Sequence, residues 1–170
     1  MGEHISADSL RRWLGVMPVV IAMHNLEEYL GFEPYAARRG LRVTQLQLQI
    51  ALSLATVLPL VLILRACHSA KQSQRMVVGF LVPAIFAANA VSHVAQTIAF
   101  RDYAPGTVTA VGLNVPVALI LYQQALRTGS LTPQQARQTL IWGTLAMGPC
   151  AMLLQSIGWL GARLLTHKLR

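Results

Sequence analysis

The chain alternates long apolar runs with short polar connections. Five runs, each about the 20 residues that a membrane helix needs, lie at residues 13–32, 46–66, 76–99, 107–126 and 139–162. Turn formers and charged residues gather in the four connections between them. The pattern therefore predicts an all-α fold, a polytopic membrane bundle of about five transmembrane helices. We expect it to form a single domain over residues 1–170.

The last of these helices is predicted to start before its apolar run. Thr132 precedes Pro133, and a threonine N-cap followed by proline at the first helical position is a common helix start. We therefore expect this helix to begin near the headgroups.

Composition supports a membrane location. Charged residues make up 12% of the chain and hydrophobic residues 54%, whereas soluble domains carry about 25% charged residues. The net charge of +8 is expected to come from Lys and Arg that flank the spans and face anionic lipid headgroups. No basic stripe interleaved with aromatic residues appears, so we expect membrane lipid as a partner and no nucleic acid.

The orientation in the membrane does not follow from the charges. The 14 Lys and Arg residues divide equally between the two sides that the five spans define, so the positive-inside rule gives no direction.

Polar and ionisable residues interrupt the apolar runs. The first run holds His24, Glu27 and Glu28 at spacing i, i+3, i+4, and the third holds Asn89 and His93 one turn apart, followed by Gln96. Such spacings place each set on one face of a helix. Ionisable groups inside a span are costly and usually face the bundle interior, so they indicate a functional site.

The polar residues of different runs are predicted to lie at one depth. At about 1.5 Å of rise per residue, the polar residues of the first and third runs lie at a similar depth in the membrane. Thr109 and Asn114 of the fourth run and Gln155 of the fifth lie at about the same depth. They lie in the half nearer the first connection, whereas the other half is almost entirely aliphatic. We therefore expect one buried polar site, open or nearly open to that side.

Imidazoles and carboxylates are the ligands of zinc and of non-haem iron or manganese. We expect His24, Glu28 and His93 as metal ligands, and Glu27 as a further ligand or the general base. His24, Glu27 and Glu28 are the candidate catalytic residues. The candidates for contacting the substrate or supporting the ligands are Asn89, Gln96, Thr109, Asn114 and Gln155.

A purely structural interpretation is the alternative. His24 and Glu28 would then satisfy each other, Glu27 would pair with Arg42 or another cation, and Asn89 and Gln155 would join helices by hydrogen bonds.

The sequence His24-Asn25-Leu26-Glu27-Glu28, together with Asn89 to His93, Tyr103 to Ala110 and Asn114-Val115-Pro116, resembles the HXXEE family of small bacterial membrane proteins. The resemblance covers most of the chain, from the first helix through the fourth. It implies that His24, Glu27, Glu28 and His93 belong to one site, and that the Pro105-Gly106 turn caps this site and starts the fourth helix. The implied location is the bacterial inner (plasma) membrane.

Three functions fit these residues. The first is a membrane metalloenzyme that acts on a lipophilic small molecule. The second is a metal-free acid–base isomerase or cyclase of isoprenoid-like substrates, since a buried carboxyl can donate a proton and a histidine accept one. The third is proton or cation translocation. The aliphatic half and the lack of an inverted repeat count against the third, although a homodimer would weaken that objection.

Overall fold

The computed structural model describes residues 7–67 and 72–168, and within these ranges the chain is helical with short connections and no strand. The elements are α1 (Ala7–Ala37), α2 (Gln45–Cys67), α3 (Gln72–Phe100), α4 (Thr107–Thr109), η1 (Ala110–Asn114), α5 (Val115–Arg127) and α6 (Pro133–Lys168). The segments α4, η1 and α5 follow one another as one helical stretch, in which η1 is a π-helix. The predicted all-α bundle is confirmed, although α1, α3 and α6 extend beyond their apolar runs at both ends.

The predicted start of the last helix is also confirmed. α6 begins at Pro133, the backbone N–H of Gln135 donates to Thr132 Oγ1 (3.2 Å), and the Thr132 N–H donates to Gln135 Oε1 (2.9 Å). These reciprocal bonds form a capping box, which satisfies two backbone donors at the helix end.

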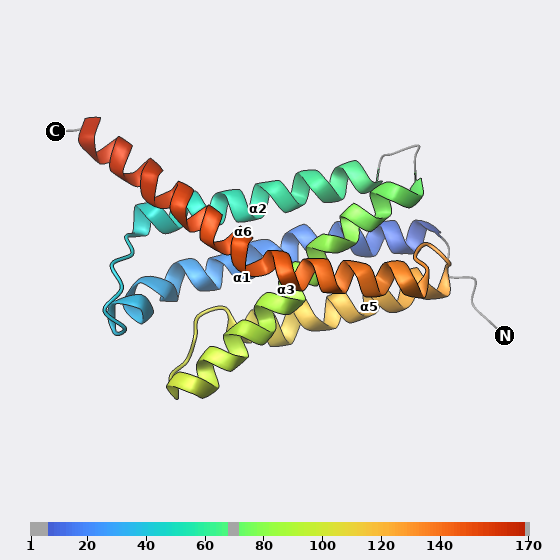
Figure 1. The fold of residues 1–170 in the computed structure, drawn as a ribbon, viewed down its shortest axis with the longest axis horizontal. Coiled ribbons are helices and arrows are strands. Elements are labelled where there is room, and N and C mark those ends of the chain that lie inside the picture. Colours follow the sequence, from blue (N-terminus) through green and yellow to red (C-terminus); the bar gives the residue numbers. More distant parts are fainter. Residues whose placement is uncertain (1–6, 68–71, 169–170) are drawn as a thin grey trace.

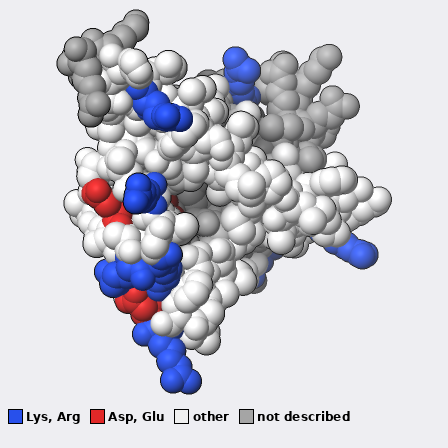
Figure 2. Space-filling view, turned by 60° about the vertical axis from the view of Figure 1, so that its left-hand side comes forward, with Lys and Arg blue, Asp and Glu red and all other residues white. Residues whose placement is uncertain are grey.

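Four helical stretches are long and apolar enough to cross a membrane: Gln45–Arg65, Gly79–Phe100, Thr107–Arg127 and Pro133–His167. α1 is not among them, because His24, Glu27 and Glu28 lower its hydropathy. A membrane crossing by α1 therefore stays a prediction. In Figure 2, uncharged side chains cover most of the face turned forward, and many of its charged side chains lie along the left-hand side.

An apolar core fills the half of the bundle that contains the start of α1. Leu10, Leu14, Met17 and Ile21 of α1 are fully or almost fully buried, at the i, i+4, i+7 spacing of one helix face. They pack with buried residues of α3 and α5, such as Phe80 and Leu121. One turn beyond Ile21 the same face presents His24, which is also fully buried. The predicted change from an aliphatic half to a polar half therefore occurs along the buried face of α1.

α6 crosses the bundle obliquely and contacts both α3 and α2 (Figure 1). At its two crossings the backbones approach closely. A Cβ atom built on Gly143 would lie 2.4 Å from Ala84 Cβ of α3, and one built on Gly158 would lie 2.5 Å from the Gln47 carbonyl oxygen of α2. Small residues at helix crossings allow such contact in membrane bundles. Between the crossings α6 passes over a cavity described below.

We predict that Gly158→Ala lowers the stability of the protein by about 1–3 kcal/mol, because the added methyl group overlaps the backbone of α2. Gly148→Ala is the matched control, since a Cβ atom added at Gly148 of the same helix would have no neighbouring atom within 4 Å. The control should be neutral or slightly stabilising. Thermal unfolding in detergent measures both; equal midpoints would contradict the close crossing.

Candidate metal centre

Three ligand atoms from two helices converge at the polar half of the bundle. Glu28 Oε1 lies 2.9 Å from His93 Nε2 and 3.5 Å from His24 Nε2. Together the three residues present one ligand atom each, all within 4.8 Å of one another. His24 is fully buried and His93 is 4% exposed. α1 and α3 thus bring together the three residues that the sequence predicts as metal ligands.

Asn89 lies one helical turn before His93 and faces the same point. Its Nδ2 atom is 2.9 Å from His24 Nε2 and 3.1 Å from His93 Nε2. An amide N–H₂ group can only donate hydrogen bonds, so in this arrangement both Nε2 atoms accept from Asn89.

Glu27 points to a different part of the protein. Its carboxylate accepts hydrogen bonds from the backbone N–H groups of Gly106 (2.9 Å), Val108 (3.1 Å) and Thr109 (2.8 Å), and from the hydroxyl groups of Thr109 (2.5 Å) and Tyr103. Gly106 is the N-cap residue of α4 and has no side chain with which to cap it. Glu27 therefore supplies from α1 the acceptors that an N-cap side chain normally provides, and its charge suits the positive end of the helix.

Thr109 connects the surroundings of the two neighbouring carboxylates. Its hydroxyl donates to Glu27 Oε2 and lies 3.0 Å from His24 Nδ1. The Thr109 hydroxyl donates its one proton to Glu27, so it can only accept a hydrogen bond from His24. His24 Nδ1 therefore carries a proton. His24 then has an unprotonated Nε2, which is the form of imidazole that binds a metal.

Gly106 covers the two imidazoles. A Cβ atom on Gly106 would lie 2.8 Å from His93 Cε1 and 2.9 Å from His24 Cε1, and the residue adopts a φ of +98°. Only glycine accommodates both the positive φ and the close contact. The structure thus agrees with the Pro105-Gly106 turn that the family resemblance implies over the site.

The connection before Gly106 is held to the end of α1. Asp102 Oδ2 accepts hydrogen bonds from Arg38 (Nη2, 3.0 Å) and Arg39 (Nη2, 3.1 Å). The bonds from Arg38 contribute most, and together with those from Arg39 they hold the pKa of Asp102 below its usual range. Burial, and then the bond to Glu27, raises the pKa of Tyr103 to about 12. Tyr103 therefore remains a neutral donor to Glu27 at physiological pH.

The other predicted site residues have separate surroundings. Gln96 accepts from Tyr35 (3.1 Å) and donates to Ser92 (3.1 Å), and Gln155 accepts from Gln47 of α2 (3.0 Å). Asn114 is fully buried at the end of η1, and neither polar atom of its side chain has a hydrogen-bond partner among the described residues. The proposed pairing of Glu27 with Arg42 is wrong, since the helix start occupies its carboxylate.

A cavity of about 460 Å³ adjoins the three ligands. Glu28, His93 and Asn89 line it, together with Ser92, Gln96 and Gln155, while aliphatic side chains of α2, α3 and α6 form most of the remaining wall. His24 does not line the cavity. The ligand cluster is therefore closed on the Gly106 side and open toward an apolar space.

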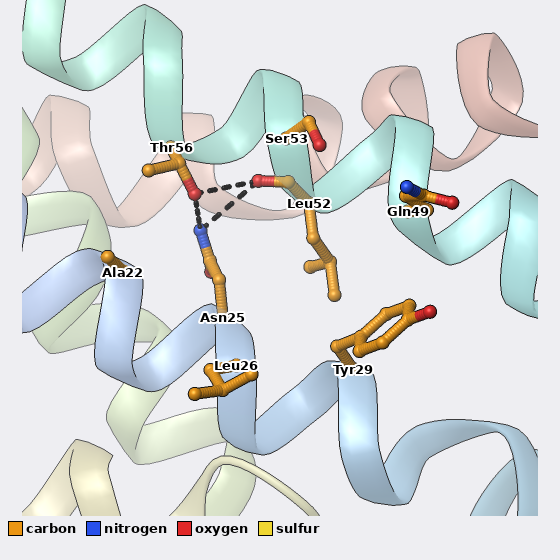
Figure 3. Close-up of a pocket in the computed structure, with 8 residues that line it drawn as sticks. All are labelled: Ala22, Asn25, Leu26, Tyr29, Gln49, Leu52, Ser53 and Thr56. Carbon is orange, nitrogen blue, oxygen red and sulfur yellow. Dashed lines mark hydrogen bonds between the residues drawn. The ribbon is translucent and has the colours of Figure 1, made fainter.

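A second, outer groove of about 300 Å³ lies between α1 and α2 (Figure 3). Asn25 and Leu52 line both spaces. The Asn25 amide donates to Thr56 Oγ1 (2.8 Å) and Thr56 donates to the Leu52 carbonyl (2.8 Å). Sequence reasoning did not single out Asn25, although a polar residue inside an apolar run is a signal of a buried contact.

We predict that Glu27→Ala lowers stability by about 1–3 kcal/mol, because the N–H groups of Gly106, Val108 and Thr109 at the start of α4 lose their acceptors. Glu33→Ala, in the same helix, should change stability by less than about 0.5 kcal/mol, as an ordinary substitution does. The unfolding midpoints in detergent report the difference. Similar midpoints for the two variants would show that Glu27 does not cap α4.

Comparison with known proteins supports the family that the motif suggests. The family described as "Protein of unknown function with HXXEE motif" matches residues 15–121. This match contains every residue of the ligand cluster and of the cap. No curated protein and no solved structure matches the chain. The chain therefore belongs to the HXXEE family.

Proposed function

We propose that the protein is a membrane metalloenzyme in which His24, Glu28 and His93 bind the metal, and that its substrate is a lipophilic small molecule. The observation that carries the proposal is the convergence of two imidazole nitrogens and one carboxylate oxygen at a buried point. In the metal-free arrangement the Asn89 N–H₂ group lies within hydrogen-bond distance of both imidazole nitrogens, and a metal bound by the three residues would replace these hydrogen bonds.

The distances suit a first-row metal. Tetrahedral zinc with bonds of about 2.0–2.2 Å places its ligand atoms roughly 3.3–3.5 Å apart. The separations from Glu28 Oε1 to the two imidazole nitrogens are 2.9 and 3.5 Å, and all three ligand atoms lie within 4.8 Å of one another, so a bound metal would draw the imidazole nitrogens to their ligand distances. Two imidazoles and one carboxylate are also the ligand set of non-haem iron enzymes, and manganese accepts similar donors.

The surroundings favour a catalytic centre over a structural one. Structural zinc sites are closed by four protein ligands, whereas catalytic sites keep a position open for water or substrate. Here three described residues converge, and two of them, Glu28 and His93, line the cavity. Thr109 and Glu27 would hold His24 in its metal-binding tautomer, as supporting groups do in known metal sites.

A metal held there would polarise a substrate oxygen or lower the pKa of a bound water. The apolar cavity wall favours a substrate drawn from the membrane lipid. The bacterial plasma membrane is the location that we propose.

A metal-free acid–base enzyme is the second candidate. The direct contact of 2.9 Å between His93 Nε2 and Glu28 Oε1 at the cavity wall supports it. If His93 Nε2 bears a proton in place of its bond from Asn89, it shares this proton with Glu28, and the pair can deliver it to a substrate. Translocation of a proton or cation receives less support. The described core residues of the opposite half, among them Leu10, Leu14 and Phe80, form a packed apolar cluster.

We predict that the detergent-purified protein binds zinc, iron or manganese at close to one equivalent. His93→Ala and Glu28→Ala should each lose the metal, because two remaining ligands hold it weakly. Glu33→Ala and His167→Ala are matched controls that remove the same residue types outside the cluster and should keep the metal. Elemental analysis after incubation with each ion measures this. Wild-type protein that stays free of metal would favour the acid–base enzyme, whose activity a chelator would leave intact.

Gly106→Ala should weaken metal binding by at least about tenfold, because a methyl group displaces both imidazoles that Gly106 covers. Gly40→Ala is the control for backbone strain: Gly40 also has a positive φ (+72°), but a Cβ atom added there would meet no atom within 4 Å. Gly40→Ala should cost stability and keep wild-type metal affinity. If both variants bind metal equally well, Gly106 does not position the ligands.

A further inference from the structure

The shape of the cavity narrows the class of substrate. On α3 the wall extends from Val82 to Gln96, a separation that corresponds to about 21 Å of helix rise. The cavity has a volume of about 460 Å³, and aliphatic side chains form most of this long wall. Its length and apolar wall suit an extended hydrocarbon chain.

The polar groups of the cavity lie in one half of it. α2 ends and α3 begins at the same end of the bundle, since only residues 68–71 separate them. The wall there includes Leu62 and Val82, whereas Asn89 lines the middle and Glu28, His93 and Gln96 lie toward the opposite end. The distance from Val82 to Asn89 is about 10 Å along the helix. At about 1.2 Å per backbone bond in an extended chain, this apolar half holds roughly eight or nine carbon atoms.

The polar end is suited to an uncharged head group. Among the described residues that line the cavity there is no Lys or Arg, and Glu28 is the one charged side chain. The neutral polar groups are those of Asn25, Asn89, Ser92, Gln96 and Gln155, besides His93. Phosphate groups are usually bound by Arg, Lys or helix N-termini. A phospholipid or a prenyl diphosphate therefore lacks a partner for its head.

From these three properties we infer that the substrate is a long-chain lipid with an uncharged oxygen head, such as a long-chain alcohol or aldehyde. Its chain lies between α2, α3 and α6, and its oxygen lies at Glu28 and His93. The placement of the head rests on the proposed function, because the metal would be the group that the oxygen meets. The placement of the chain depends on the cavity alone.

Photolabelling tests the inference. The probe is hexadecan-1-ol with a diazirine near the middle of its chain, added to protein in lipid nanodiscs. Labelled peptides should come from the cavity wall of α2, α3 and α6. Unlabelled hexadecan-1-ol should compete, and hexadecyl phosphate should compete at least about tenfold less well.

Ala55→Trp fills the cavity from α2, where Ala55 lines it. This variant should lose labelling by at least about tenfold. Ala99→Trp is the matched control, because Ala99 is exposed on α3 and lines neither space. It should label as the wild type does. The unfolding midpoint of each variant shows that it is folded.

Equal labelling of the two tryptophan variants, or equal competition by hexadecyl phosphate, would overturn the inference. The metal content of the same samples separates this result from the proposed function. If the protein binds one equivalent of metal but the labelling is unselective, the inferred class of lipid is wrong and the proposed metal site stands. If labelling is selective but the protein binds no metal, the proposed metal site is wrong, and so is the placement of the lipid head group on the metal.

Discussion

A helix that begins inside a bundle of apolar helices has backbone N–H groups that need acceptors, since burying them unpaired is costly. In this protein the acceptors come from Glu27, a residue of a different helix. The bonds join α1 to the start of α4 across some 80 positions of sequence. The arrangement of the polar half depends on this connection, because the same turn holds Gly106 against the imidazoles of His24 and His93.

The two adjacent glutamates therefore have separate surroundings. Consecutive residues lie about 100° apart around a helix, which lets Glu27 face the start of α4 while Glu28 faces His93 and the cavity. Thr109 couples the two, because its hydroxyl contacts both Glu27 and His24. The cap thus fixes the orientation of a ligand as well as the position of a helix.

Much of the fold was predictable, because apolar runs of about 20 residues indicate membrane helices. The five helices, the capped start of α6 and the aliphatic half follow from length, spacing and hydrophobicity. Helix ends were less predictable: α1 begins at Ala7 and ends at Ala37, where polar residues continue the helix beyond its apolar run. The π-helix of η1 was not predicted, because the sequence pattern carries no signal that separates it from an α-helix.

The candidate site was predictable in part. Helical spacing placed His24 and Glu28 one turn apart, and depth placed them near His93. The sequence could not assign Glu27, because the assignment requires knowing that Gly106 starts a helix within reach of α1. That signal existed, since a glycine N-cap cannot supply its own acceptor. Gln155 lines the cavity beside the ligands, but Asn114 does not, because depth does not determine which way a side chain faces.

The central claim is that His24, Glu28 and His93 share one metal ion. X-ray absorption spectroscopy of the protein loaded with one equivalent of zinc tests it most directly. The account predicts two imidazole ligands and at least one oxygen ligand, at about 2.0–2.2 Å, and loss of this bound zinc in His93→Ala. A zinc ion ligated by sulfur, or a spectrum that His93→Ala leaves unchanged, would contradict it.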